Sequence, residues 1–259
     1  MAQGESQLVT VGDATIELVR RGRGRPLLLL PGEEMLEADS AFAAALAERH
    51  EVIIVAPPGF GRSTRPHWLT EPRDLAYFCR AVLKELGLGP LPVIGCSLGG
   101  WIAAEMAAMD DSVFSHLVLI DPYGVKLGTP TERDLVDIWQ IAPLKVAALK
   151  WHDAAKGKRD LAALSDEALA AEARNLESFD RFCWEPYLHN PKLKHLLFRI
   201  AKPTLFIWGE RDGIAPPAYG EKFCALIPSA RFAAIAAAGH YPHLEQPEAV
   251  LGRVSELIG

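Results

Sequence analysis

The stretch PVIGCSLGGW, residues 92–101, joins an apolar run to an alanine-rich segment through a cluster of small residues. The run at 91–94 is typical of a strand buried on both faces, and residues 98–109 predict a helix. Glycines flank Ser97 at the join, so the strand and the helix can approach closely without Cβ clashes. Such a turn holds a serine hydroxyl in front of the N–H groups of a helix N-terminus. The stretch therefore predicts a reactive serine, with an ordinary tight turn as the alternative.

Outward from this turn, apolar runs alternate with helical patterns in both directions. The expected strands are 8–11, 15–19, 27–30, 52–56, 91–95, 116–121, 203–209 and 230–235. The expected helices outside the interruption described next are 38–49, 72–87, 98–109, 217–226 and 246–257. The alternation predicts an α/β fold with a mostly parallel central sheet flanked by helices. The first two strands are expected to form a hairpin around Gly12-Asp13.

Residues 123–200 interrupt the alternation, because they contain no clear strand and two helical stretches, at 131–142 and 166–179. A long insertion between two strands is more often functional than idle. We therefore expect a helical cap at 123–200, inserted after the sixth strand, over a core built from 1–122 and 201–259. Ligands bind at the carboxyl ends of strands in open α/β sheets, and the cap would cover that edge. Most of its aromatic side chains are expected to form the cap's own core.

Composition and charge limit the classes of binding partner that we expect. The formal net charge is −6 with no long run of either sign, which argues against nucleic acid and membrane and leaves a small-molecule substrate. No apolar stretch approaches ~18–20 residues, and the N-terminal MAQGESQLVT lacks the pattern of a signal peptide. The four cysteines, Cys79, Cys96, Cys183 and Cys224, are scattered without metal or redox spacing. We expect reduced thiols in a cytoplasmic protein.

A serine hydroxyl is a poor nucleophile without a base, so the chain must supply a histidine and an acid. His240 lies in the loop after the last expected strand, and Asp212 follows the strand before it. Both positions fall on the edge of the sheet that carries Ser97, in the chain order Ser, Asp, His. Asp121, at the end of LVLID, is the alternative acid and could instead stabilise the loop that enters the cap. His243 is expected to pack or cap where the last helix begins.

Five motifs carry a resemblance over nearly the whole chain: PG after the third expected strand, PPGFGRS after the fourth, GCSLGG, WGERDGIAP and GHYPHLEQPE. On these residues the chain resembles the α/β-hydrolase superfamily, in its capped, single-domain serine form. The resemblance implies that Ser97 attacks an acyl carbon, His240 takes the proton and Asp212 orients the imidazole. It implies oxyanion donors from the backbone N–H groups of Leu98 and Glu33, and no metal or organic cofactor.

The loop after the third expected strand departs from the family pattern. Many members carry His-Gly-x-Gly there, whereas this chain has Pro31-Gly32-Glu33-Glu34. Carboxylates near a developing oxyanion disfavour it, so we expect Glu33 and Glu34 to point to solvent or to pair with a cap cation. The alternative is that Glu34 faces the pocket and binds a cationic or hydroxyl group of the substrate. The expected pocket residues are Glu34, Tyr123, Trp184 and Tyr241.

The leading prediction is a hydrolase that cleaves a small or medium, largely apolar ester, thioester or lactone through an acyl-enzyme on Ser97. Carbon–carbon bond hydrolysis of ring-cleavage products and cofactor-free perhydrolysis are variants of the same site. A small-molecule receptor on a hydrolase fold is the alternative from another class. The glycines of PPGFGRS lack the Lys-Ser/Thr ending of a nucleotide loop, so a tight turn is the better interpretation of that motif.

Overall fold

A single eight-stranded sheet organises the chain, in the order β1-β2-β4-β3-β5-β6-β7-β8. The structure, a computed structural model, describes residues 5–158 and 160–259. Residues 1–4, part of the stretch that we expect not to be a signal peptide, lie outside the described residues, as does residue 159 of the expected cap. The strands are β1 Glu5–Val11, β2 Ala14–Arg21, β3 Arg25–Leu30, β4 His50–Val55, β5 Leu91–Cys96, β6 Phe114–Ile120, β7 Thr204–Gly209 and β8 Ala230–Ile235.

The pairing of the strands confirms the predicted fold class. β1 and β2 form an antiparallel hairpin, and β2 runs antiparallel to β4. The remaining neighbours, from β4 through β3 to β8, are parallel. In such a sheet the carboxyl ends of the parallel strands share one edge, which brings together loops that are far apart in the sequence.

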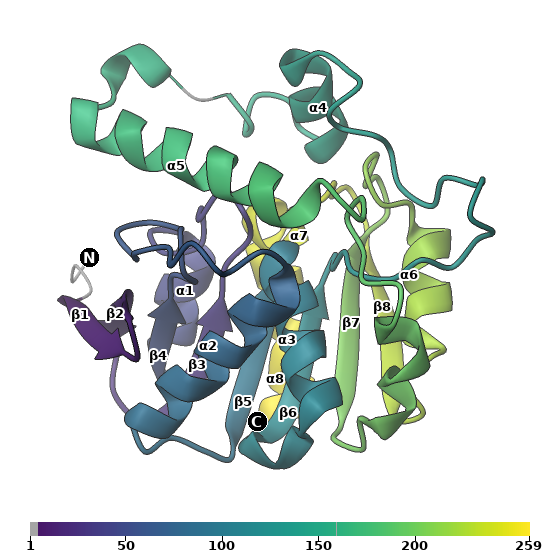
Figure 1. Cartoon of the computed structure of the whole chain (residues 1–259). Helices are drawn as coiled ribbons and strands as arrows, with labels where there is room; N and C mark the ends of the chain where they lie inside the picture. Colours follow the sequence, from purple (N-terminus) through teal and green to yellow (C-terminus); the bar gives the residue numbers. More distant parts are fainter. Residues whose placement is uncertain (1–4, 159) are drawn as a thin grey trace.

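Helices cover both faces of the sheet (Figure 1). They are α1 Ala41–Leu46, α2 Pro72–Glu85, α3 Leu98–Met109, α4 Pro143–Lys150, α5 Asp166–Cys183, α6 Pro217–Cys224, α7 Pro242–Glu245 and α8 Pro247–Ile258. The leucines of β3 explain the unbroken apolar run in the sequence. Leu28 and Leu30 pack with side chains of α2 and α3, whereas Leu27 and Leu29 pack with α1 and α8. Successive strand residues face opposite sides, so a strand covered on both faces is apolar throughout.

The segment between β6 and β7, residues 123–200, contributes α4 and α5 and, within its described residues, no strand. Figure 1 shows both helices lying over one end of the sheet. We call residues 123–200 the inserted segment. Its helix α5 matches the expectation at 166–179 and begins at the cap residue Ser165, whose hydroxyl accepts the Ala168 N–H.

The helix expected at 131–142 is wrong, because turns occupy that stretch. Tertiary hydrogen bonds take the backbone groups that a helix would need. The Val136 N–H donates to the Ile214 carbonyl, and the Tyr187 hydroxyl bonds both the Ile138 N–H and the Val136 carbonyl. Asp134 accepts the N–H groups of Leu127 and Gly128. The first helix of the inserted segment starts only at Pro143, where a missing N–H costs nothing.

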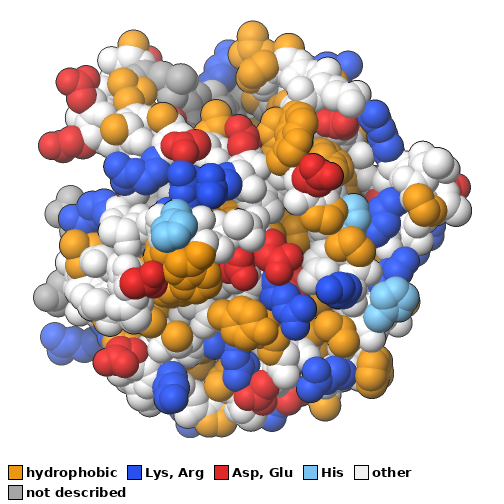
Figure 2. Space-filling model, viewed as in Figure 1, with side chains coloured by type: hydrophobic (Ala, Val, Ile, Leu, Met, Phe, Trp, Pro, Cys, Tyr) orange, Lys and Arg blue, Asp and Glu red, His pale blue; other side chains and the backbone are white. Residues whose placement is uncertain are grey.

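The surface mixes charge signs. Figure 2 shows acidic and basic side chains interspersed with hydrophobic ones over the viewed face. None of the described helices is both long and apolar enough to cross a membrane.

Candidate active site

Ser97 stands at a sharp turn between β5 and α3, in a backbone conformation (φ 50°, ψ −114°) that residues other than glycine rarely adopt. The Ser97 N–H donates to the Ile120 carbonyl of the neighbouring strand at 2.8 Å. At the neighbouring glycine positions there is no room for a side chain. A Cβ at Gly99 would lie 2.2 Å from the Leu30 carbonyl oxygen, and one at Gly95 would lie 2.5 Å from the Gly99 carbonyl oxygen. Close packing of helix on strand therefore projects the Ser97 side chain at the sheet edge.

Ser97, His240 and Asp212 form one continuous hydrogen-bonded chain. The Ser97 Oγ lies 2.8 Å from His240 Nε2, and His240 Nδ1 lies 2.7 Å from Asp212 Oδ2. The three residues follow β5, β8 and β7 respectively, and all are buried. The other oxygen of Asp212 accepts the N–H groups of Ile214 and Ala215, which fixes the carboxylate in its orientation toward the imidazole. The structure thus brings together the three residues that the sequence analysis selected.

The His240 loop is held from three sides. Its backbone N–H donates to the Lys150 carbonyl at 2.7 Å. The Tyr123 ring stacks on the imidazole, with centroids 5.0 Å apart and planes at 16°. The buried carboxylate of Glu245 accepts the Gly239 N–H at 2.6 Å and also bonds the backbone of the inserted segment through the Asp153 N–H. The imidazole is therefore positioned by packing and by backbone contacts as well as by its acid.

The two alternatives considered in the sequence occupy other roles. Asp121 accepts the Gly209 N–H through Oδ1 and lies beside Asp212. Burial and the charge of Asp212 raise the pKa of Asp121 well above its usual range, which favours its neutral form. His243 is at the start of α7, where its Nε2 lies 3.0 Å from Glu37 in a buried pair. The hydrogen-bonded acid of His240 is Asp212.

A third group touches the serine, and the sequence analysis did not foresee it. The Glu33 carboxylate accepts a hydrogen bond from Ser97 at 2.7 Å through Oε2, and its Oε1 accepts one from the Lys150 ammonium at 2.7 Å. Burial raises the pKa of Glu33, but the charges of Lys150 and His240 outweigh it and lower that pKa to about 2. A buried, ionised carboxylate therefore lies in direct contact with the hydroxyl.

Lys150 gathers four side chains into what we call the Lys150 cluster: Glu33, Glu34, Lys150 and Tyr241. Its ammonium also reaches Glu34 at 2.6 Å and the Tyr241 hydroxyl at 2.9 Å, and that hydroxyl donates to Glu34 at 2.7 Å. Burial lowers the pKa of Lys150, but the two carboxylates outweigh it and raise that pKa above its usual value. Both carboxylates thus pair with a cation of the inserted segment, and Glu33 does not point to solvent. The cluster has two acids and one base, so it keeps one negative charge.

The remaining expected pocket residues lie in two different environments. Tyr123 and Tyr241 flank the imidazole of His240. Trp184, in contrast, is 57% exposed and packs edge-on against Trp139 with centroids 5.2 Å apart. The buried Tyr123 hydroxyl has no hydrogen-bond partner among the described residues. Burial raises the pKa of Tyr123 well above its usual value, which keeps this hydroxyl a neutral donor.

The expected oxyanion donors are the N–H groups of Leu98 and Glu33. Leu98 is the first residue of α3, where helical N–H groups lack an internal partner. Among the described residues, no backbone carbonyl accepts a hydrogen bond from either N–H. Both groups are therefore available to an incoming oxygen.

Within residues 5–158 and 160–259, two buried groups have donor atoms close enough to hold a metal ion. One is Asp121, Asp212 and His240, in which Asp212 and His240 are already engaged with each other. The other is Glu37, Cys96 and His243. Burial, together with the charges of Glu37 and Asp121, raises the pKa of the Cys96 thiol well above its usual value, so the thiolate that a metal needs is disfavoured. Neither group is assigned to a metal here.

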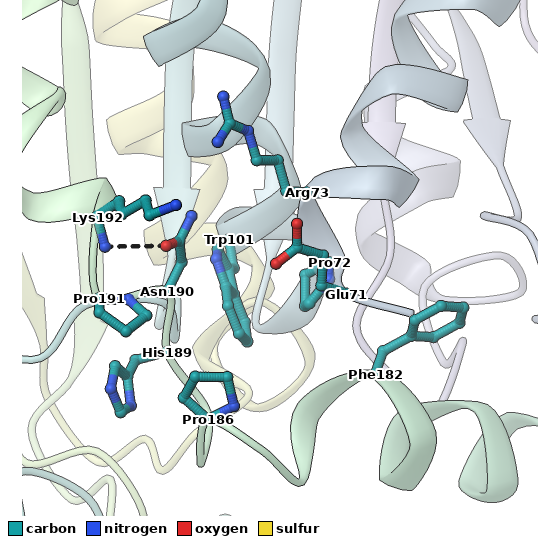
Figure 3. Close-up of a pocket in the computed structure, with 10 residues that line it drawn as sticks. All are labelled: Glu71, Pro72, Arg73, Trp101, Phe182, Pro186, His189, Asn190, Pro191 and Lys192. Atoms are coloured by element: carbon teal, nitrogen blue, oxygen red, sulfur yellow. Dashed lines mark hydrogen bonds between the residues drawn. The ribbon is translucent and has the colours of Figure 1, made fainter. Parts of the chain in front are cut away.

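Ser97 is not among the residues that line a cavity of about 110 Å³, the cavity drawn in Figure 3. Trp101 and Asn190 stand on its wall, and both donate to the buried carboxylate of Glu105. The lining residues are Glu71, Pro72, Arg73, Trp101, Phe182, Pro186, His189, Asn190, Pro191 and Lys192. Ser97 and His240 are each only 1% exposed, so a substrate must displace side chains to reach them.

Comparison with known proteins identifies the family and the fold. The alpha/beta hydrolase family matches residues 27–253. The chain is 33% identical over 258 residues to the polyketide synthase ThaQ of Burkholderia thailandensis, which covers 92% of the chain but 12% of that protein. It is 25% identical to the pimeloyl-[acyl-carrier protein] methyl ester esterase of Vibrio cholerae, covering 91% of the chain and 94% of the esterase. The solved meta-cleavage product hydrolase CumD of Pseudomonas fluorescens IP01 shares the fold, with a TM-score of 0.79, 20% identity, and coverage of 98% of this chain and 97% of that chain.

Proposed function

The chain belongs to the alpha/beta hydrolase family, and on that basis we propose that it cleaves a small or medium, largely apolar ester, thioester or lactone through an acyl-enzyme on Ser97. The observation that carries the proposal is the unbroken chain from Ser97 Oγ through His240 to Asp212, with spacings of 2.8 and 2.7 Å. A base in hydrogen-bond contact with a hydroxyl, itself oriented by a third group, is the arrangement that activates a nucleophile.

The proposed reaction follows from these contacts. His240 Nε2 takes the Ser97 proton as Oγ attacks the acyl carbon, and Asp212 stabilises the imidazolium that forms. The N–H groups of Leu98 and Glu33 donate to the developing oxyanion. His240 then returns the proton to the leaving group. Water attacks the acyl-enzyme with His240 again as base, and the free acid leaves.

The surroundings of the site support an acyl substrate with an apolar part. Phe179 packs against Tyr123, with ring centroids 6.3 Å apart, and against Trp139, at 5.7 Å. We propose that the inserted segment (123–200) acts as a cap over a core of residues 1–122 and 201–259, with these rings facing the acyl group. The Vibrio cholerae relative is by its name a methyl ester esterase, which supports ester chemistry for this chain.

The test is the initial rate on p-nitrophenyl esters of increasing acyl length. We expect activity with a preferred chain length, and a loss of at least about a thousandfold in Ser97→Ala. Ser255→Ala, an exposed serine on α8, is the matched control and should keep the rate of the unaltered protein.

Equal rates for the unaltered protein and Ser97→Ala on all esters would contradict the proposal. A fluorophosphonate probe then separates the alternatives. Covalent labelling of Ser97 without turnover of esters would favour a receptor, whereas turnover of ring-cleavage products alone would favour carbon–carbon hydrolysis.

A further inference from the structure

The Ser97 hydroxyl has two acceptors but one proton. Its Oγ lies 2.7 Å from Glu33 Oε2 and 2.8 Å from His240 Nε2. A hydroxyl donates one hydrogen bond. When His240 is neutral and its Nδ1–H donates a hydrogen bond to Asp212, its Nε2 is an acceptor as well. Two acceptors then compete for a single serine proton.

The Glu33 carboxylate is held in its position beside Ser97. Its second oxygen accepts a hydrogen bond from Lys150 at 2.7 Å, and both side chains are buried, at 4% exposure for Glu33 and 7% for Lys150. The ammonium is fully used, because it also contacts Glu34 and Tyr241. A carboxylate whose pKa is about 2 is a weak base, so Glu33 remains an anionic acceptor and does not remove the serine proton.

Attack by Ser97 on an acyl carbon changes the hydrogen bonds that Glu33 accepts. The proton moves to His240 Nε2, and the Oγ becomes bonded to the acyl carbon, so Glu33 Oε2 loses its donor. A buried charged acceptor left without a donor is costly. A substrate that brings its own donor to Oε2 removes that cost as the transition state forms, when it accelerates the reaction most.

The Tyr123 hydroxyl is a second polar group near Ser97 that can form a hydrogen bond with a substrate. It is fully buried and makes no hydrogen bond of full geometry among the described residues, and its nearby groups include the Ser97 hydroxyl and the Glu33 carboxylate, which both influence its pKa. As a neutral phenol it can donate to a substrate oxygen. An ammonium group on the substrate could satisfy Glu33 alone, whereas a hydroxyl can donate to Glu33 and accept from Tyr123.

We infer that Glu33 determines specificity and selects acyl groups with a hydroxyl on the first or second carbon from the scissile carbonyl. The inference rests on the proposed acyl-enzyme function. The acyl carbon bonds to an oxygen that is itself 2.7 Å from Glu33, so donors on these two carbons lie within reach of the carboxylate. The substrate hydroxyl donates to Glu33 Oε2 in place of the Ser97 hydroxyl.

The experiment compares three thioesters with the same leaving thiol, N-acetylcysteamine: butyryl, 2-hydroxybutyryl and 3-hydroxybutyryl. Thiol release gives kcat/KM for the full chain, for Glu33→Ala and for the isosteric Glu33→Gln. Glu34→Gln is the matched control, because Glu34 shares Lys150 and Tyr241 with Glu33 but makes no hydrogen bond to Ser97. We expect one hydroxyacyl thioester to exceed butyryl by at least about tenfold in the unaltered protein.

That preference should fall to within about twofold in Glu33→Ala, shrink in Glu33→Gln and persist in Glu34→Gln. Equal kcat/KM for butyryl and both hydroxyacyl thioesters in the unaltered protein would overturn the inference without any variant. So would a preference that survives Glu33→Ala. Butyryl turnover that depends on Ser97 but shows no hydroxyl preference leaves the proposed function standing. No turnover above Ser97→Ala on these thioesters and on the p-nitrophenyl esters defeats both.

Discussion

The carbonyl of Lys150, the last residue of α4, accepts the backbone N–H of His240 at 2.7 Å. The same residue holds Glu33 with its side chain, so one position of the inserted segment contacts both the histidine loop and the loop that follows β3. The approach of the backbones is so close that a Cβ at Gly239 would lie 2.4 Å from the Lys150 carbonyl oxygen. The inserted segment therefore contributes contacts that build the site.

Replacing Lys150 tests how much of the fold depends on this cation. Lys150→Met leaves the buried carboxylate of Glu33 without its cation, and such a loss costs about 3–5 kcal/mol of unfolding free energy. Urea unfolding at neutral pH measures it. Lys145→Met, at an exposed position of α4, is the control and should change the unfolding free energy by under about 0.5 kcal/mol. Equal stability of the two variants would show that the ion pair contributes little.

The pKa of Glu33 predicts how stability depends on pH. The folded value of about 2 lies below the unfolded value of 4.5, so the contribution is fully present above pH 4.5 and is lost as the pH falls toward 2. The unaltered protein should exceed Glu33→Gln in unfolding free energy by up to roughly 3 kcal/mol at pH 7, and by less at pH 3. Urea titrations at the two pH values provide the measurement. A gap that stays constant or widens on acidification would exclude this linkage.

Replacing each of two aspartates near His240 with asparagine should change kcat by very different amounts. Asp212→Asn removes the charge that orients the imidazole and should lower kcat by about 10⁴-fold. Asp121→Asn keeps an oxygen for the Gly209 N–H and mimics the neutral acid that its raised pKa favours, so kcat should stay within about tenfold. Steady-state kinetics on the preferred ester decide between them. The reverse ranking would make Asp121 the acid of the site.

Two glycine-to-alanine changes form a matched pair for the packing of the turn. Gly99→Ala places a Cβ 2.2 Å from a backbone oxygen and should cost several kcal/mol or prevent folding. Gly252→Ala lies in α8 with nothing within 4 Å of the added Cβ, and should stabilise by about 0.5–1 kcal/mol. Thermal unfolding of both proteins gives the comparison. A stable, active Gly99→Ala variant would refute the close helix–strand contact.

Signals that are local in the chain were readable from the sequence. The leucine run of β3 predicted a strand covered on both faces, and the helical pattern at 166–179 predicted the helix that the structure has as α5. The glycines around Ser97 predicted a sharp turn, and the structure places that turn between β5 and α3. The turn at Ser97 and the positions of Asp212 and His240 after two later strands selected three residues that meet, because the carboxyl ends of parallel strands share one edge.

Patterns that depend on distant partners were not readable. The helical pattern at 131–142 is overridden by hydrogen bonds to Ile214 and Tyr187, which lie elsewhere in the chain. Trp184 has the residue type expected of a pocket wall, but it is exposed at the end of α5. Propensity is a weak prior against such tertiary contacts.

The sequence by itself determined the α/β architecture and the three loops whose side chains converge, since hydrophobic periodicity and turn chemistry are encoded by neighbouring residues. Only the tertiary structure decided the charge state around the serine. Glu33 and Lys150 are 117 positions apart, and no spacing rule links them. They meet because the sheet edge and the inserted segment bury both charges in one place, where each ion needs the other to remain charged.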